Sequence, residues 1–211
     1  MTIETPLGAI LAGGASRRFG SPKALAAFGG RTIAERVRDA IREAVGNAVL
    51  VTNEPELFAD LPLPTRPDVH PGAGPVAGIE AALRWAEEEG RPGALVAACD
   101  MPFLDSRALR LLVDFARGAN PSPDAVLFRM EDGRNPPLCA WFSVRCLPAA
   151  GRVLAGDDRS VRALLSSVAT AWVPMEEIAR FCDSATMFFN VNTPGDLRRA
   201  EQIARELDER A

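Results

Sequence analysis

Residues 8–23 read GAILAGGASRRFGSPK, and this stretch decides how the rest of the chain is interpreted. Its first five residues are an apolar run, which predicts a buried strand over residues 8–12. The glycines that follow let backbone N–H groups approach phosphate oxygens, while Ser16 adds a donor and Arg17 and Lys23 add positive charge. The stretch therefore predicts a strand that ends in a phosphate-binding loop. A tight strand-to-helix turn with solvated arginines is the alternative.

Short apolar runs alternate with amphipathic segments along the chain, which is typical of an α/β domain with a mostly parallel sheet. The first half predicts strands over 8–12, 48–52 and 94–98 and helices over 32–44, 75–89 and 106–116, with Ser106 as an N-cap. The second half predicts strands over 125–130, 138–142 and 170–173 and helices over 160–167 and 193–210. A polar turn joins the first two of these strands, so an antiparallel excursion is expected there. Proline-rich residues 62–75 are expected to form a long loop.

The composition excludes several classes of protein. Of 211 residues, 47% are hydrophobic and 25% are charged, as in ordinary folded domains. The apolar runs are far shorter than the ~20 residues of a membrane helix, and the first residues lack a secretory pattern, so a cytoplasmic location without a membrane partner is expected. A net charge of −4 disfavours nucleic acid as a partner. Four widely spaced cysteines predict neither disulfides nor a zinc site.

Lysine and histidine each occur once. Lys23 stands alone among arginines, which suggests a position where a compact, strongly hydrated charge is required; chance is the alternative. His70 lies in the turn-like stretch DVHPGAGP, with no serine or cysteine nucleophile motif near it. We therefore expect a solvated loop histidine there and no histidine-dependent triad.

Four blocks of sequence occur in a characteristic order. Residues 11–24 (LAGGASRRFGSPKA) resemble the signature L-A-G-G-x-S-x-R-M-G-x-D-K, and residues 74–78 (GPVAG) resemble G-P-L-A-G. Residues 99–104 (CDMPFL) resemble C-D-x-P-F-[IL], and residues 189–194 (FNVNTP) resemble F-x-N-[IV]-N-T-P. Together they resemble the molybdenum cofactor guanylyltransferase family, within the wider Rossmann-like nucleotidyltransferases. The first block alone would indicate only that wider group, whereas N-V-N-T-P is much more specific.

The resemblance implies a single-domain α/β fold over residues 1–211, Rossmann-like, with a mostly parallel sheet and helices on both faces. It implies a nucleotide-binding half over about 1–105 and a second-substrate half over about 106–211. The implied reaction transfers GMP from GTP to Mo-molybdopterin, giving the guanine dinucleotide form of the cofactor and pyrophosphate. Mg²⁺ is the implied cofactor, with Mn²⁺ as a substitute. Other proteins of molybdenum cofactor biosynthesis and molybdoenzyme chaperones are implied as further partners.

Asp100 has a physical reason to be a site residue. It follows the apolar strand over 94–98, so its carboxylate is expected at the carboxyl edge of the sheet, where ligands bind in open α/β folds. A hard oxygen ligand there suits Mg²⁺ shared with nucleotide phosphates. A helix cap or turn acid is the alternative reading of Asp100. The resemblance assigns the metal to this residue.

The resemblance also assigns roles to other residues. The catalytic set is Lys23, Arg17 and Asp100, and the nucleotide-binding set is Leu11, Ala12, Gly13, Gly14, Ser16, Lys23, Asn53, Asp68, Gly78 and Asp100. Backbone N–H groups of residues 11–14 are expected to contact phosphate or base. The pterin-binding set is Arg159, Asn190 and Asn192. Taken alone, Asn53 and Asp68 look like ordinary turn formers.

Two departures from the family pattern keep other functions open. Phe19 replaces a methionine, which is a tolerable apolar exchange, and Pro22 replaces the common acid before the lysine. The Pro-Lys form also occurs in related cytidylyltransferases, so CTP is an alternative nucleotide. A non-catalytic protein that delivers nucleotide or cofactor is a second alternative, although the chain keeps both the lysine and the metal acid.

Overall fold

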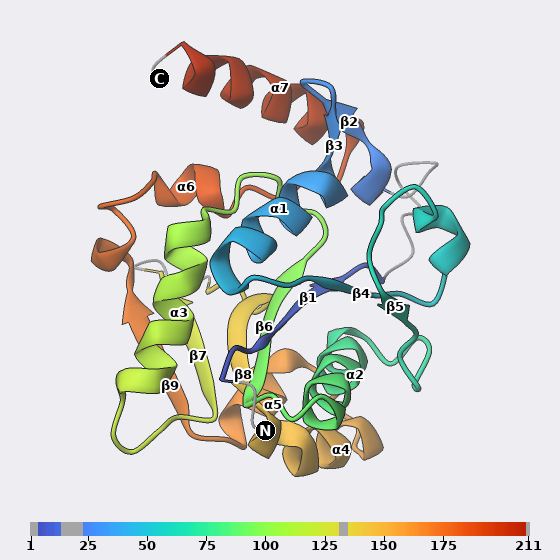
Figure 1. Ribbon diagram of the computed structural model, residues 1–211, viewed down its shortest axis with the longest axis vertical. Helices are drawn as coiled ribbons and strands as arrows, with labels where there is room; N and C mark the ends of the chain where they lie inside the picture. Colours follow the sequence, from blue (N-terminus) through green and yellow to red (C-terminus); the bar gives the residue numbers. More distant parts are fainter. Residues whose placement is uncertain (1–3, 14–22, 131–134, 210–211) are drawn as a thin grey trace.

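The computed structural model describes residues 4–13, 23–130 and 135–209. Its centre is a seven-stranded sheet in the order β5-β4-β1-β6-β8-β7-β9 (Figure 1). The strands are β1 (Leu7–Leu11), β4 (Val49–Val51), β5 (Thr65–Arg66), β6 (Gly93–Ala98), β7 (Ala125–Arg129), β8 (Cys139–Ser143) and β9 (Thr170–Pro174). Strands from both halves of the chain share the sheet, because β6 pairs with β8. The predicted α/β class is confirmed.

One strand of this sheet runs against the others. Four neighbouring strands are parallel to one another: β5, β4, β1 and β6. The strand β8 is antiparallel to its neighbours β6 and β7. The strands β7 and β9 are parallel to each other and therefore run in the same direction as β6. The predicted antiparallel excursion is therefore confirmed in the part of the chain that the structure describes. Of the polar turn between β7 and β8, residues 131–134 lie outside the described ranges.

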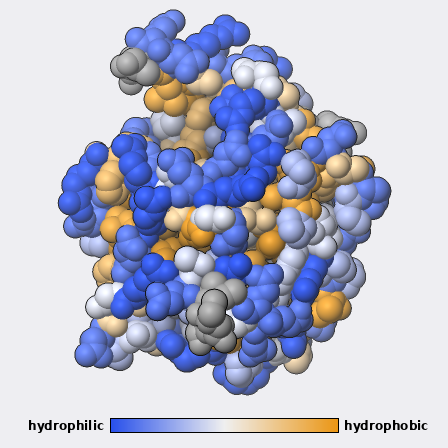
Figure 2. Space-filling model, in the orientation of Figure 1, coloured by the Kyte–Doolittle hydropathy of each residue, from blue (hydrophilic) through white to orange (hydrophobic). Residues whose placement is uncertain are grey.

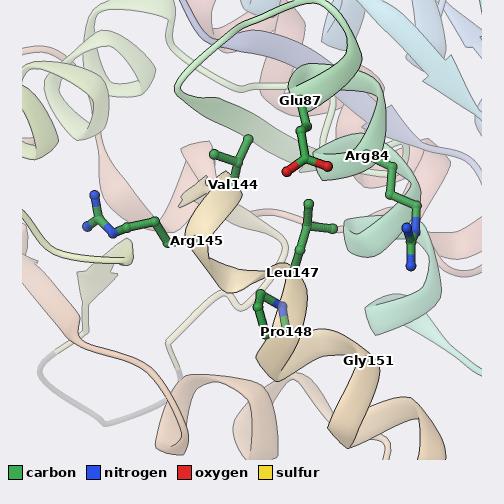
Figure 3. A pocket seen from close by; sticks show the side chains of 7 residues that line it. All are labelled: Arg84, Glu87, Val144, Arg145, Leu147, Pro148 and Gly151. Carbon is green, nitrogen blue, oxygen red and sulfur yellow. The ribbon is translucent and has the colours of Figure 1, made fainter.

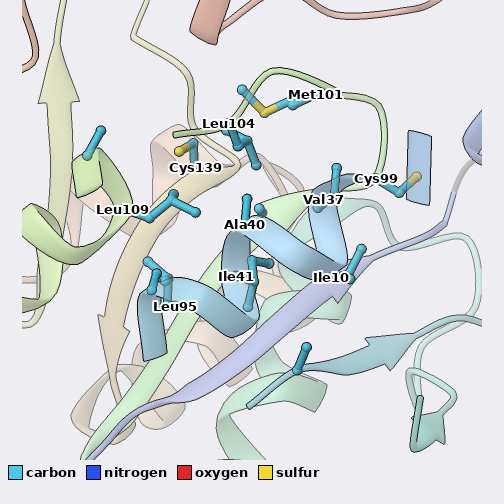
Figure 4. Packing of buried hydrophobic residues seen from close by; sticks show 14 of the residues in the cluster. Ile10, Val37, Ala40, Ile41, Leu95, Cys99, Met101, Leu104, Leu109 and Cys139 are labelled. Carbon is cyan, nitrogen blue, oxygen red and sulfur yellow. The ribbon is translucent and has the colours of Figure 1, made fainter. Parts of the chain in front are cut away.

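Helices cover both faces of the sheet, as predicted (Figure 1). One layer contains α1 (Ile33–Val45) and α3 (Ser106–Gly118), and the other contains α2 (Pro75–Glu88), α4 (Leu147–Ala155) and α5 (Val161–Ser166). Alternate residues of β1 enter different cores: Ile10 packs under α1, whereas Ala9 and Leu11 pack under α2. Figure 4 shows the first core, where Ile10 and Leu95 of the sheet meet Ile41 of α1. Because both faces of β1 are covered by helices, every residue of this strand is buried, which explains its continuous apolar run.

Caps set the helix boundaries. The side chain of Thr32 accepts from the N–H of Glu35 and the Glu35 carboxylate accepts from the N–H of Thr32, so α1 begins at residue 33 rather than 32. The expectation that Ser106 caps the third helix is wrong. Asp105 is the N-cap, because its carboxylate accepts from two N–H groups of the first turn. Ser106 is the first residue of α3 and is buried.

Several elements were not anticipated. The strand β5 interrupts the proline-rich segment, and the short strands β2 (Ala27–Phe28) and β3 (Arg31–Thr32) form a separate hairpin. The helix α7 (Pro194–Asp208) begins at the predicted Thr193 cap, which is a capping box with Asp196. It lies beside β2 and β3, away from the main sheet (Figure 1), with Ala200 and Ile203 buried on its inner side. A short helix, α6 (Ser184–Met187), precedes it.

The surface in this view is mostly polar, with apolar groups between the polar ones (Figure 2). Within the described ranges, no helix is both long and apolar enough to span a bilayer. All four cysteine thiols are free. Burial raises the pKa of Cys99, Cys139 and Cys146 to about 12, so these thiols stay protonated at neutral pH.

Candidate active site

Three parallel strands place three of the predicted site residues at one edge of the sheet. Gly13 follows β1, Asn53 follows β4 and Asp100 follows β6, so all three lie beyond the carboxyl ends of these strands. Two backbone hydrogen bonds extend the strand pairing to this edge. The N–H of Ala12 donates to the carbonyl of Val51 at 2.9 Å, and the N–H of Cys99 donates to the carbonyl of Leu11 at 3.1 Å. This edge is where open α/β sheets bind ligands.

The single lysine joins two segments that are far away in the sequence. The Nζ of Lys23 lies 2.5 Å from Oδ2 of Asp100 and 2.9 Å from Oδ1 of Asn192. The side chains of Lys23 and Asp100 are only 24% and 15% exposed, so water and salt screen this ion pair less than an ordinary surface pair. The structure thus brings together a predicted cation, a predicted metal ligand and a predicted pterin contact.

Asn192 is held in place from both sides. The N–H of Val191 donates to the carbonyl of Asp100 at 2.9 Å. The N–H groups of Asn192 and Thr193 donate to Oδ2 of Asp196 at 2.9 and 2.8 Å, as part of the cap of α7. These backbone bonds, first of all the one from Asn192, hold the pKa of Asp196 below its ordinary value, and the charge of Lys23 adds to the effect. The start of α7 therefore fixes the amide that Lys23 contacts.

The two carboxylate oxygens of Asp100 differ in their partners. Oδ2 contacts Lys23, whereas Oδ1 is buried and has no hydrogen-bond partner among the described residues, an arrangement that costs free energy unless something binds there. A divalent cation suits this oxygen, because Mg²⁺ is commonly held by one or two carboxylates together with phosphate oxygens and water. Among the described residues no group of three or more His, Cys, Asp or Glu could hold a metal. The residues present therefore fit an ion that substrate phosphates help to bind.

Asn53 and Asp68 form one unit. The Nδ2 of Asn53 donates to Oδ2 of Asp68 at 2.9 Å, and the N–H of Asp68 donates to Oδ1 of Asn53 at 3.0 Å. Both bonds are exposed at the ends of β4 and β5, which are neighbouring parallel strands. The second amide hydrogen of Asn53 and the remaining lone pairs of the Asp68 carboxylate are left for a ligand. Because the two side chains are bonded to each other, a ligand that contacts one of them would lie close to the other.

The loop after β1 is only partly described. Leu11 and Ala12 are buried, and Gly13 is exposed, with open space where a side chain would be. The N–H of Ala12 already donates to the carbonyl of Val51, so it is not available to a ligand. Among the described residues of this stretch, the expected backbone contact with phosphate or base is therefore assigned to Gly13. Gly14, Ser16 and Arg17 lie outside the described ranges, as do Phe19 and Pro22.

Gly78 lies inside α2 and faces the sheet. A Cβ atom there would lie 3.2 Å from both Cδ atoms of Leu11, so glycine allows α2 to pack closely against the end of β1. Gly74 precedes α2 without a side-chain cap, and Pro75 is the first helical residue. The N–H groups of this helix start are therefore not taken by a capping side chain. The structure assigns Gly78 to packing that positions α2.

The three predicted pterin residues do not lie together. Asn190 is exposed, on the same segment as Asn192, and its Nδ2 donates to the carbonyl of Phe188 at 3.2 Å. Arg159 lies in the turn between α4 and α5, where its Nε donates to the carbonyl of Gly156 at 3.3 Å. Within the described ranges, none of its hydrogen bonds reaches the Lys23 and Asp100 cluster.

A cavity of about 560 Å³ opens elsewhere, between α2 and the start of α4 (Figure 3). Its lining consists of Arg84, Glu87, Val144, Arg145, Leu147, Pro148 and Gly151. None of the predicted site residues that the structure describes lines it. Arg145 extends away from Glu87 (Figure 3) and pairs with Asp124 at 2.8 Å.

Sequence reasoning missed Glu80, a charged residue on the buried side of α2. It is 1% exposed, and it interrupts the apolar run between Ile79 and Ala81. A carboxylate inside an apolar helix stretch is the signal that could have found it. The sequence predicts a solvated loop histidine at position 70, but Nε2 of His70 lies 3.3 Å from Oε2 of the buried Glu80.

Comparisons with known proteins show the family of this chain. Residues 8–171 match the MobA-like NTP transferase domain. A molybdenum cofactor guanylyltransferase from Rhizobium meliloti (strain 1021) is 34% identical, over 97% of this chain and 94% of its own length. Another, from Rhodobacter capsulatus, is 35% identical, over 94% of this chain and 96% of its own length. The crystal structure of molybdopterin-guanine dinucleotide biosynthesis protein A from Archaeoglobus fulgidus has a TM-score of 0.79 at 28% identity, covering 95% of this chain and 99% of that one.

Proposed function

Because this chain belongs to the MobA-like NTP transferase family, we propose that it transfers GMP from GTP to Mo-molybdopterin, forming the guanine dinucleotide cofactor and pyrophosphate. The family makes it a nucleotidyltransferase, and the names of its nearly full-length relatives indicate the guanylyl rather than the cytidylyl reaction. The observation that carries the proposal in this chain is the meeting of Lys23, Asp100 and Asn192 at the carboxyl edge of the sheet.

The reaction needs positioning and charge neutralisation more than a strong base. A terminal phosphate oxygen of the pterin forms a bond to the α-phosphorus of GTP, while the bond from that phosphorus to the pyrophosphate oxygen breaks. The attacking oxygen is already anionic at neutral pH, so no proton has to be removed from it. Lys23 supplies a compact positive charge with three donors, and Asp100 and Asn192 fix its direction.

We assign the divalent cation to Asp100. Its Oδ1 has no hydrogen-bond partner in the described ranges, and Oδ2 contacts Lys23. Mg²⁺, with Mn²⁺ as a substitute, would offset negative charge on the triphosphate as it reacts. Arg17 is proposed to add a second positive charge.

The two substrates are proposed to meet across this cluster. Gly13 and the Asn53–Asp68 unit would contact the nucleoside of GTP, since they follow the strands β1, β4 and β5 on one side of Asp100. Asn190 and Asn192 would contact the pterin on the other side, next to the start of α7. The pterin role of Arg159, the cytoplasmic location, and the molybdoenzyme chaperones as partners remain predictions.

Calorimetric titration tests the nucleotide part of this proposal. The purified chain is titrated with GTP and with CTP, each with and without Mg²⁺, alongside Asp100→Ala. We expect GTP to bind in preference to CTP, with an affinity that depends on both Mg²⁺ and Asp100. A preference for CTP would move the chain to cytidylyl transfer. Tight GTP binding without pyrophosphate release in the presence of the pterin would indicate a delivery protein instead.

A further inference from the structure

Glu80 is a buried carboxylate for which the proposed reaction has no use. It lies in α2 and is 1% exposed. Its Oε1 accepts from Nη2 of Arg84 at 2.7 Å and from Nε of Arg84 at 3.2 Å. Its Oε2 is buried and has no hydrogen-bond partner within the part of the chain that the structure describes, and Nε2 of His70 lies 3.3 Å from it. A buried carboxylate is unfavourable unless a cation or donor compensates it, so the contact with His70 has an energetic reason.

His70 also contacts the nucleoside side of the active site. Its backbone N–H donates to Oδ1 of Asp68 at 3.0 Å, which leaves Oδ2 of Asp68 for Asn53. Its carbonyl accepts from the N–H of Ala73 at 3.0 Å, which closes a turn before α2. One residue therefore links the exposed Asn53–Asp68 unit through its backbone to the buried Glu80 through its side chain.

The loop that carries Asp68 needs such an attachment. It connects β5 to α2, and it turns into the helix through Gly72 and Gly74, whose φ angles are 80° and 84°. These glycines are conformationally permissive, so the turn itself restricts the loop weakly. Holding the loop before GTP arrives reduces the ordering cost that binding would otherwise have to meet.

We propose that His70 is a positioning residue: its contact with Glu80 holds loop 67–74 against α2 and keeps the Asn53–Asp68 unit preformed for the nucleoside of GTP. The inference rests on the proposed function, because it takes the Asn53–Asp68 unit as a nucleoside contact. It requires no change in the protonation of His70, since a neutral imidazole with its proton on Nε2 and an imidazolium can both donate towards Oε2.

The expected signature is a change in GTP affinity without a change in chemistry. Suppose that in His70→Ala the Asn53–Asp68 unit has its binding geometry in only about one molecule in ten. KM for GTP should then rise about tenfold, while kcat stays the same. Inhibition by pyrophosphate should not change, because pyrophosphate carries no nucleoside. His70→Gln should restore KM to within about twofold of the wild type, because its side-chain amide can donate towards Glu80.

The test measures steady-state pyrophosphate release by the full-length chain with GTP, Mg²⁺ and Mo-molybdopterin, together with thermal unfolding of each variant. Val69→Ala is the matched control, since Val69 is the neighbouring residue and is 62% exposed. An unchanged KM in His70→Ala, or an equal loss of GTP and pyrophosphate affinity, would overturn the inference. A wild-type chain that neither binds nor turns over GTP would instead overturn the proposed function.

Discussion

The Nζ of Lys23 and Oδ2 of Asp100 lie 2.5 Å apart across 77 residues of sequence. The pair joins the end of the loop after β1 to the end of β6, and both side chains are largely shielded from water. Because the other Asp100 oxygen has no hydrogen-bond partner among residues 4–13, 23–130 and 135–209, we propose that the carboxylate holds Lys23 and a divalent cation at the same time. The proposed roles of Lys23 and of the cation depend on this division of the two oxygens.

Replacing Lys23 tests the first of these two roles. Lys23→Ala should lower kcat/KM by about 10²- to 10³-fold, the usual effect of removing one preorganised donor from developing charge. Lys23→Arg should restore only part of the activity, because a planar guanidinium does not reproduce a compact ammonium. Pyrophosphate release measures both. Arg199→Ala, which removes an exposed cation of α7, is the control. Full activity of Lys23→Ala would remove Lys23 from the mechanism.

Replacing Asp100 tests the second role. Asp100→Asn keeps the size of the side chain but removes its charge, so the Mg²⁺ concentration for half-maximal activity should rise at least about tenfold. The measurement is pyrophosphate release over a Mg²⁺ series, with exposed Asp60→Asn as the control. An unchanged Mg²⁺ dependence would show that the ion binds elsewhere.

The cap of α7 predicts a dependence of stability on pH. Backbone donation, first from Asn192 and also from Thr193, holds the pKa of Asp196 below its ordinary 3.8. Its stabilising effect is therefore present above pH 3.8 and is lost as the pH falls through the lower pKa of the folded state. Asp196→Asn removes a negative charge from the first turn of α7, so it should lower the free energy of unfolding by about 0.5 kcal/mol at pH 7. The difference from the wild type should disappear in acid.

Urea unfolding at several pH values measures this effect. Asp114→Asn, at an exposed position on α3, is the control and should differ little from the wild type at any pH. A constant difference between Asp196→Asn and the wild type down to acid pH would contradict the assigned ionisation.

Two glycines predict opposite effects on stability. A Cβ at Gly8 would lie 2.4 Å from Cγ2 of Ile41 and 2.5 Å from the carbonyl oxygen of Asn47, so Gly8→Ala should lower the free energy of unfolding by about 3 kcal/mol. Gly151 lies within α4 with open space around it, so Gly151→Ala should raise it by about 0.5–1 kcal/mol. Urea unfolding compares the two. Equal effects of both changes would contradict the packing described at Gly8.

Regular elements were predictable where one local signal was strong. The spacing of Val37, Ile41 and Ala44 predicted α1, and the Thr193-Pro-Gly-Asp sequence predicted the start of α7. Asp105 was missed because it and Ser106 are both good caps, and only the fold decides which side chain turns back to the helix. The strand β5 was missed because two residues among prolines have no periodicity, and it exists through pairing with β4.

The site was predictable as a set of residues but not as a set of contacts. The strand end before Asp100 predicted its place at the sheet edge, whereas its ion pair with Lys23 depends on tertiary structure. The mutual bonds of Asn53 and Asp68 also depend on two strands meeting. Glu80 has a local signal, since it is a charge within an apolar helix stretch, but its contact with His70 depends on which loop covers that helix face.

Transfer of the labelled α-phosphate tests the central claim most directly. The full-length chain is incubated with Mo-molybdopterin, Mg²⁺ and either GTP or CTP labelled at the α-phosphate, and the label in the pterin product is measured against pyrophosphate released. We predict that the label moves from GTP into a guanine dinucleotide, with one pyrophosphate for each transfer, and that Asp100→Asn slows this transfer at a Mg²⁺ concentration that saturates the wild type. Transfer from CTP alone, or no transfer from either nucleotide by a folded chain that binds GTP, would contradict the account.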